Sequence, residues 1–509
     1  MAQVNKLDSN STALRIAEEL SLKTLPGTPV WIPYEPNSYG DFGGQVSTVA
    51  RNPINANRQR KKGVVTDLDA SGNFNTDLTQ ANLRSLLQGF FFADVREKRV
   101  PTATTAVNGA GVYSTTVTTG VFVGSLVFMA GFTNAANNGF KVVTAVAANT
   151  SITVSGTTVV EASPPATATI TVVGYRTETA ADLKIDVSGA WPALTSTTKN
   201  LTQLGLIVGE WVFIGGDAAA NQFANATNNG FKRVKTIATN RIEFDKSDAT
   251  MVVDAAAGKS VDIYVGRVLR NETGTLIKRR TYQLERTLGA PDDAQPTQIQ
   301  SEYLVGAVAN ELTFNIPTAD KLNVDLGFIG LTTEQRDGVT GVKSGTRPAL
   351  TESDAFNTSS DFSRMRMAIV SSNPAPTPLF GYVTEAAVSI KNNATAAKAV
   401  GVLGGFDINL GTFEVGGSVT AYFSNISAIN AVRNNSNVSI DLALVKNNAG
   451  IVIDIPLLAL GDARAAVEQD QPITLPLEMM AASAALIDPN ADYTLLMNFF
   501  DYLPTLADV

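Results

Sequence analysis

The chain has 509 residues, a length that suggests about three or four domains. Hydrophobic residues make up 44% of it, which is ample for folded cores. It contains neither histidine nor cysteine, so Cys/His zinc sites, thiol nucleophiles, Ser-His-Asp triads and disulfides are excluded. The net charge of −8 argues against a protein that coats nucleic acid, because phosphate binding requires a cationic surface. Only 17% of the residues are charged, and Ala, Val, Thr, Asn and Gly dominate. This composition favours a mainly β protein with short turns and little helix.

The N-terminal residues lack the uninterrupted apolar core of a signal peptide, and no later run is long and apolar enough to span a bilayer. We therefore expect synthesis and folding in a cytoplasm, without membrane insertion by this chain.

Residues 35–94 predict a strand, a long hairpin loop, a second strand and a short helix. Thr79 is a candidate N-cap, and Leu83, Leu86 and Leu87 fall on one helical face. Gly89 is placed to end this helix.

The hairpin loop carries the densest run of positive charge in the chain, at Arg58, Arg60, Lys61 and Lys62. Such a cluster can contact DNA or acidic residues of an adjacent subunit, or it can be a solvated loop tip. Because a long hairpin can reach a partner, a subunit contact and a solvated tip both remain open.

The sequence NNGFK occurs twice, at Asn137 to Lys141 and at Asn228 to Lys232. Each copy follows a Val-Gly step and an apolar strand, and Asn-Asn-Gly supplies the positive φ angles of a tight turn between strands. The second copy carries extra Ala- and Asn-rich residues, which indicate a lengthened surface loop. We predict two related all-β modules, at 105–180 and 181–265, inserted into a larger domain.

The region from Val388 to Phe423 resembles the region from Val46 to Leu78 in its order of Val-Ser strand, polar loop, Gly-rich strand and final strand before a helix. In the later copy Ser424 or Asn425 can cap the helix. We therefore predict two related β-sandwich or split-barrel domains, each with one short helix. Their predicted bounds are 1–104 with 266–345 for the first and 378–509 for the second, with 346–377 as a connection.

No motif in the chain predicts catalysis, a cofactor or a metal. Gly258-Lys259-Ser260 lacks the first glycine of a phosphate-binding loop, and the GVKSG segment from Gly341 has no histidine to activate its serine. The acidic pairs Asp67/Asp69 and Asp292/Asp293 lack the spacing of a calcium loop. We predict that Asp67 and Asp69 point at solvent or a neighbouring subunit, and that the protein is not an enzyme.

Three stretches in the N-terminal part resemble the major tail tube proteins of long, non-contractile-tailed bacteriophages: YEPNSYGDFGG, VARNPINANRQRKKG and DLDASGNFNTDLTQANLRSLLQGFFFADVREK. The run FEVGGSVTAYFSNISAINAVRNNSNVSIDLALVKNNAGIVIDIPLLALG resembles the closing part of the same family. The resemblance covers most of the chain except the repeated modules, and it rests on overall pattern.

The resemblance implies a structural virion protein whose rings stack around a channel for DNA. Most members form hexameric rings from single domains, so a duplicated chain implies a pseudo-hexameric trimer. The implied partners are other copies of the chain and the tape measure, tail terminator and distal tail proteins, with DNA passing without specific binding. We expect an acidic lumen, modules that project outward, and docking of the basic loop on a neighbouring ring.

A different class also fits the repeats, namely a surface adhesin or cell-wall-binding protein whose modules recognise glycans. Its only support is Trp191 and Trp211 near the second copy, and core packing explains a tryptophan on an apolar strand more often. A glycosidase that uses two carboxylates is a more distant third.

Overall fold

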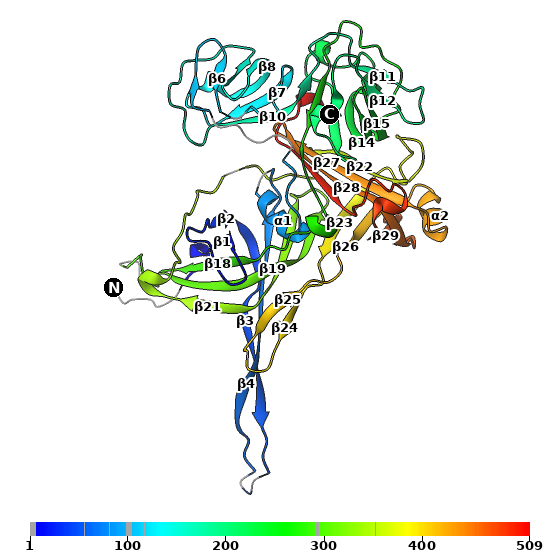
Figure 1. Ribbon diagram of the computed structural model, residues 1–509. Helices are drawn as coiled ribbons and strands as arrows, with labels where there is room; N and C mark the ends of the chain where they lie inside the picture. Colours follow the sequence, from blue (N-terminus) through cyan, green and yellow to red (C-terminus); the bar gives the residue numbers. More distant parts are fainter. Residues whose placement is uncertain are drawn as a thin grey trace.

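The computed structural model describes residues 7–54, 56, 58–80, 82–97, 104–116, 118–291, 295–351 and 353–508. Across these residues the regular structure is mainly β-strand, with two α-helices and several short 3-10 helices. Its strands form a 16-stranded sheet, a 12-stranded sheet and a separate two-stranded ribbon (Figure 1). The predicted mainly β fold is confirmed.

The first half of the 16-stranded sheet comes from both sides of the inserted modules. Its elements are β1 (Ala13–Glu18), β2 (Ile32–Tyr34), β3 (Pro36–Arg51), β4 (Lys61–Asp77), α1 (Arg84–Phe91), β17 (Arg267–Arg270), β18 (Tyr282–Gly289), β19 (Gln300–Ile316), β20 (Asn323–Gly330) and β21 (Thr332–Arg336). Strands β3 and β4 form the long hairpin that projects from the body (Figure 1).

The second half is continuous in sequence. Its elements are β22 (Phe362–Ile369), β23 (Val383–Lys391), β24 (Thr395–Lys398), β25 (Gly405–Asn409), β26 (Glu414–Tyr422), α2 (Ser427–Arg433), β27 (Val438–Lys446), β28 (Ala449–Asp462), β29 (Thr474–Ala481) and β30 (Leu496–Phe500). Strand β22 lies inside 346–377, the range predicted as a connection, so that range also supplies a strand of the sheet.

The two halves share one strand order. In the first it is β1-β18-β19-β20-β4-β3, and in the second it is β22-β27-β28-β29-β26-β23, with every neighbouring pair antiparallel. Both orders have an added strand at the corresponding place, β21 on β19 and β30 on β28, and the first also has β2 on β1. The predicted relationship between the halves is therefore visible in their topology.

One ladder joins the halves. Strand β23 pairs antiparallel with the C-terminal part of β19, from Glu311 opposite Lys391 to Ile316 opposite Ala386. Leu312 and Phe314 on β19 and their partners Ile390 and Val388 are all buried, because they face the common apolar core. The halves thus share one continuous sheet.

The two helices cover the apolar side of this sheet. Phe90 of α1 packs edge-on against Phe328 of β20, with ring centroids 5.2 Å apart. The prediction that Gly89 ends α1 is wrong, since the helix continues to Phe91 and Phe92 adopts the left-handed conformation that closes it. Gly89 instead lets the helix approach β18, where an added Cβ would lie 2.6 Å from the Tyr282 hydroxyl.

Helix α2 begins later than predicted, since its N-cap is Ile426, which has no side-chain cap, rather than Ser424 or Asn425. Asn425, the residue before the cap, accepts a hydrogen bond of 2.8 Å from the Ser427 backbone N–H, and Asn435 takes a positive φ after the helix. The polar residues therefore marked the region of the start and missed the capping position.

The inserted segments form the 12-stranded sheet. Its strands are β5 (Ala106–Val107), β6 (Val112–Ser114), β7 (Ser125–Ala130), β8 (Gly139–Ala147), β9 (Ser151–Val154), β10 (Thr169–Arg176), β11 (Lys184–Asp186), β12 (Ala193–Thr195), β13 (Trp211–Ile214), β14 (Gly230–Ala238), β15 (Arg241–Ser247) and β16 (Asp262–Val265). The order is β11-β12-β15-β14-β13-β16 followed by β10-β7-β8-β9-β6-β5. The second list mirrors the first about the β10–β16 pair, so the two modules are copies related by an approximate twofold axis.

Both modules use equivalent aromatic residues to hold the C-terminal segment. Phe128 and Phe140 of the first module stack on Tyr502, with centroids 5.3 and 4.8 Å away. Phe231 of the second module packs edge-on against Phe500 at 5.8 Å. The modules interrupt the sequence of the first half, yet these contacts seat them on the end of the second half (Figure 1).

Candidate assembly surfaces

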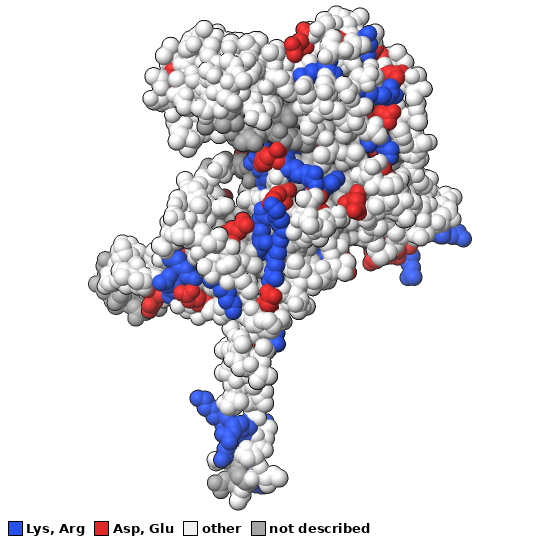
Figure 2. All heavy atoms as spheres, in the orientation of Figure 1, with Lys and Arg blue, Asp and Glu red and all other residues white. Residues whose placement is uncertain are grey.

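The basic cluster lies at the far end of the long hairpin (Figure 2). Strands β3 and β4 stay paired out to Arg51 opposite Lys61, and the side chains of Arg58, Arg60, Lys61 and Lys62 are all exposed. Among the described residues, no carboxylate forms an ion pair with any of these four. The structure therefore presents them together as one cationic tip held away from the body.

Asp67 and Asp69 lie on the same hairpin, nearer the body, and were predicted to face solvent or a neighbouring subunit. The Asp69 side chain is 66% exposed, as predicted, and both carboxylates also bind Lys398 of the same chain, at the end of β24, with Nζ of Lys398 2.6 Å from Oδ1 of Asp69. The hydrogen bond from Lys398 also lowers the pKa of Asp67 below its usual value. These two carboxylates therefore tie the hairpin to the second half of the chain.

The sheet has a polar face opposite its helices. Thr313 lies opposite Asp325 on one side and Ser389 on the other, and the next pair, Asn315 and Ala387, points the same way. Because side chains alternate between the faces of a strand, this face continues across β3, β4, β20, β19, β23, β26, β29 and β28. It is mainly polar, with the exposed Met480 of β29 as an apolar residue on it. It crosses from the first half into the second.

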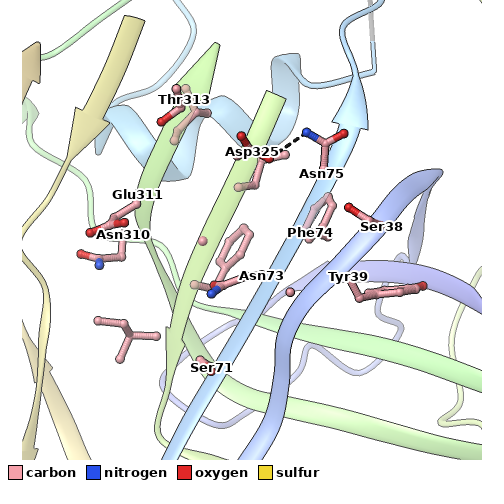
Figure 3. Close-up of a pocket in the computed structure, with 16 residues that line it drawn as sticks. Ser38, Tyr39, Ser71, Asn73, Phe74, Asn75, Asn310, Glu311, Thr313 and Asp325 are labelled. Carbon is pink, nitrogen blue, oxygen red and sulfur yellow. Dashed lines mark hydrogen bonds between the residues drawn. The ribbon is translucent and has the colours of Figure 1, made fainter. Parts of the chain in front are cut away.

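Asparagine side chains link neighbouring strands on this face. The Asn75 amide donates to Asp325 at 2.7 Å (Figure 3). It also donates to Asn323 at 2.8 Å. Asn315 donates to the same two side chains from the other side, at 2.9 and 2.7 Å. Asn75 and Asp325, together with Glu311 and Asn73, line an open hollow of about 470 Å³. The linked amides hold the polar surface in register.

Carboxylates outnumber cations on this face. The acidic residues on it or at its margin are Asp77, Glu311, Asp325, Glu385, Glu414 and Glu478. The basic ones are Lys391 and Lys321, and Lys321 lies 2.8 Å from Asp77. The face is therefore net negative.

Two strands on this surface keep one open edge. Strand β28 pairs with β29 over Leu458 to Asp462, but no described strand pairs with its other side from Ala459 onward. Strand β3 likewise pairs only with β4 within the described chain. The corresponding segments in the other half, β19 and β23, pair with each other. The β28 edge and the β3 edge therefore correspond to the two partners of the β19–β23 ladder, and each lacks its own partner within the described chain.

The NNGFK repeat proves to be a structural device. Asn137 accepts a bond of 2.8 Å from the Val159 N–H and donates one of 2.9 Å to Glu161. In the second module Asn228 accepts from the Val252 N–H at 2.9 Å. The sequence signal that we missed is the VVE of Val159 onward and the VVD of Val252 onward, which together complete this duplicated turn.

The remaining candidates bring no reactive groups together. Gly258 has a positive φ, and Lys259 donates to the Ala219 carbonyl at 2.5 Å, as expected of a turn. In the GVKSG segment the Lys343 N–H donates to the Tyr303 hydroxyl at 2.9 Å. Asp292 and Asp293 lie outside the described residues. In the described part of the chain, no group of His, Cys, Asp or Glu side chains is arranged to hold a metal ion. Neither described α-helix has the length needed to cross a lipid bilayer.

The two tryptophans of the glycan hypothesis lie in different surroundings. Trp211 is fully buried, with the Arg364 guanidinium 4.9 Å from its ring centroid, so it cannot serve as a binding platform. Trp191 is half-buried and lines a hollow of about 230 Å³ together with Lys235 and Asp488. Only one of the two can face a ligand.

A duplicated, helix-backed β-sheet with open strand edges is typical of a subunit that assembles through the edges of its sheet. The chain matches the family model described as phage tail tube protein twice, over residues 9–203 and 178–481, and it belongs to that family. It is thus a bacteriophage structural protein of the virion tail with a duplicated domain. A search of curated proteins returned no match.

Proposed function

We propose that three copies of this chain close into a pseudo-hexameric ring, and that such rings stack into the tail tube through which DNA passes into the host. The observation that carries this proposal is the ladder between β19 and β23. In this ladder one half of the chain pairs with the other. The corresponding strands β28 and β3 have open edges that could form the same ladder with a second copy.

Aligning the starts of α1 and α2, at Arg84 and Ser427, fixes the register of the two strand orders and gives the expected contact between copies. This alignment places Val388 of β23 on Tyr39 of β3, seven residues from Val46, its counterpart in the sequence comparison. Phe314 of β19, which lies opposite Val388, then corresponds to Asp462 of β28. The end of β28 in one copy would therefore pair antiparallel with β3 near Tyr39 in the next. Closing the ring removes both open edges, which otherwise favour uncontrolled aggregation of strand-rich chains.

The polar face is the surface that we assign to the lumen. Its opposite side is covered by α1 and α2, and the modules lie on the end of the second half away from the hairpin tip (Figure 1). A net negative lining repels phosphate, so DNA could slide through without binding while the wall confines it.

We assign the tip residues Arg58, Arg60, Lys61 and Lys62 to contact with the adjacent ring, because the long hairpin carries them beyond the body. At the ends of the tube the tape measure, tail terminator and distal tail proteins would complete the structure. Assembly would take place in the host cytoplasm. The tube-type domains would comprise 1–104 with 266–345 and 378–509, with the modules at 105–180 and 181–265.

Electron microscopy of the purified protein tests the proposal. We expect rings or tubes whose end-on class averages have threefold symmetry with six similar lobes around a channel. Dispersed monomers that bind bacterial cell wall would instead support the adhesin hypothesis, for which the half-buried Trp191 is the remaining candidate contact.

A further inference from the structure

The ribbon formed by β24 and β25 is the second half's counterpart of the projecting part of the long hairpin. It connects β23 to β26, as the outer parts of β3 and β4 connect the parts of these strands that lie in the sheet. It lies beside the base of that hairpin (Figure 1). One side of the ribbon is bound to the first half: the Gly405 N–H donates to the Leu331 carbonyl at 3.2 Å, and Arg279 lies 2.7 Å from Asp407. Lys398 adds the contact with Asp67 and Asp69.

Large apolar side chains of the ribbon nevertheless remain in solvent. Phe406 is 51% exposed and Val402 44%, and Val400, Leu403 and Leu410 are also exposed. Five exposed large apolar residues within eleven positions exceed the scattered single residues expected on a free surface, and such patches mark interaction sites.

The long hairpin carries a matching set. Val49 and Val64, which lie opposite each other in the ladder, are 56% and 53% exposed, and Val46 and Val65 are exposed as well. Val49, Val64 and Val65 lie between the basic tip and the part of the hairpin that Lys398 contacts, and Val46 lies opposite Leu68 within that part. Within the described chain, therefore, two apolar strand pairs are left uncovered.

The contact inside the chain shows which surfaces meet. The ribbon of the second half lies against the first half at Asp67 and Asp69, within β4, the strand that leads to α1. With Val388 placed on Tyr39, their ladder partners Gly417 and Phe74 also correspond, so the place of Asp67 to Asp69 in the second half runs from Leu410 to Thr412, directly after β25. If copies in a ring repeat the arrangement of the halves, the hairpin of the next copy lies against the exposed side of the ribbon.

We infer that, in the ring proposed above, the valine-bearing part of the β3–β4 hairpin of a second copy covers Val402, Phe406 and Leu410 of the ribbon. The three long hairpins would then each be clamped by a neighbour within the ring, and only their basic tips would extend to the next ring. This assigns one hairpin two contacts of different chemistry, an apolar one along its length and a cationic one at its end.

Because the natural chain has no cysteine, single thiols report this contact directly. One protein carries Phe406→Cys and the other carries Val64→Cys. The two are mixed as monomers, allowed to assemble, and then oxidised. Sedimentation separates isolated rings from tubes. The disulfide-linked heterodimer is quantified by mass. Both positions are exposed, so neither change should disturb folding.

Two matched pairs complete the design. Ser38→Cys with Asp462→Cys reports the ring contact itself, and Phe406→Cys with Val160→Cys, which is exposed on the first module, is the background. We expect the ribbon–hairpin pair to link in isolated rings at roughly a hundredfold the background rate, as neighbouring thiols experience millimolar effective concentrations.

Linking of the ring pair without the ribbon–hairpin pair would overturn this inference and leave the ring intact. Linking of the ribbon–hairpin pair in tubes but not in isolated rings would also overturn it, by placing the contact between rings. Absence of both links would overturn the ring proposal as well.

Discussion

Arg233 of the second module and Asp454 of β28, 221 positions apart in sequence, form a buried ion pair with an N–O distance of 3.0 Å. Arg233 also bonds Asp245 within its own module at 2.9 Å. Nearby, Lys246 lies 3.2 Å from Asp441 of β27. The contact between this module and the tube-type sheet is therefore ionic as well as aromatic, and its charges are removed from water.

Replacing Arg233 with Met should destabilise the protein by about 3–5 kcal/mol, because Asp454 would remain buried without its partner. Arg241→Met is the matched control, since Arg241 pairs with Asp186 and Glu243 in a more exposed position and should cost less than about 1 kcal/mol. Denaturant unfolding followed by tryptophan fluorescence compares the two. Equal decreases in the free energy of unfolding for the two variants would show that the buried Arg233–Asp454 pair stabilises the protein no more than the exposed one.

The first module should lose stability in acid. Burial raises the pKa of Glu161, but hydrogen bonds from the Thr133 and Asn134 backbone and from Asn137 outweigh it and lower the pKa to about 2 from the usual 4.5. A carboxylate with a lowered folded-state pKa stabilises the fold above its unfolded pKa, and this contribution is lost as the pH falls from about 4.5 towards 2.

Hydrogen exchange of residues 133–161, measured while the pH is lowered through that window, tests this expectation. Glu161→Gln should make the module less stable near neutral pH and remove this part of the acid dependence. Glu468→Gln, in an exposed loop, should leave the profile unchanged. An identical profile for Glu161→Gln and the natural protein would contradict the assignment.

Neutralising the hairpin tip should impair ring stacking without unfolding the chain. In the variant Arg58, Arg60, Lys61 and Lys62 all become Gln; since these side chains are exposed, thermal unfolding should be unchanged within about 0.5 kcal/mol. Negative-stain images should show rings with few tubes. The control replaces Lys184 and Arg433, exposed cations elsewhere, with Gln. Normal tubes from the tip variant would rule out the docking role.

Assembly should protect two backbone segments from hydrogen exchange, residues 459–466 and 36–42, because these are the open strand edges that we expect to pair. In the monomer their outward N–H groups have no strand partner in the described chain and should exchange fast. Strand β30 is the internal control, as it pairs with both β17 and β28 in a single chain. Protection of only one segment on assembly would contradict the proposed ladder.

Local patterns were sufficient for much of the fold. Period-two alternation predicted the strands, and Asn-Gly pairs predicted the repeated turns. The predicted N-caps Thr79 and Asn425 were wrong, because the helices begin after Leu83 and Ile426. The charge run at Arg58 predicted the basic hairpin tip. The end of α1 was predicted wrongly at Gly89, because burial of Phe90 and Phe91 against the sheet stabilises a longer helix than the glycine alone would allow.

By itself the sequence determined the β character, the two repeats and the family, because each depends on residues close together in the chain. Only the tertiary structure decided that β23 pairs with β19, that the modules mirror each other about β10 and β16, and that they rest on the second half. Alternation states which face of a strand is apolar but not which strand lies beside it. That choice depends on which apolar surfaces and buried charges, distant in sequence, can be removed from water together.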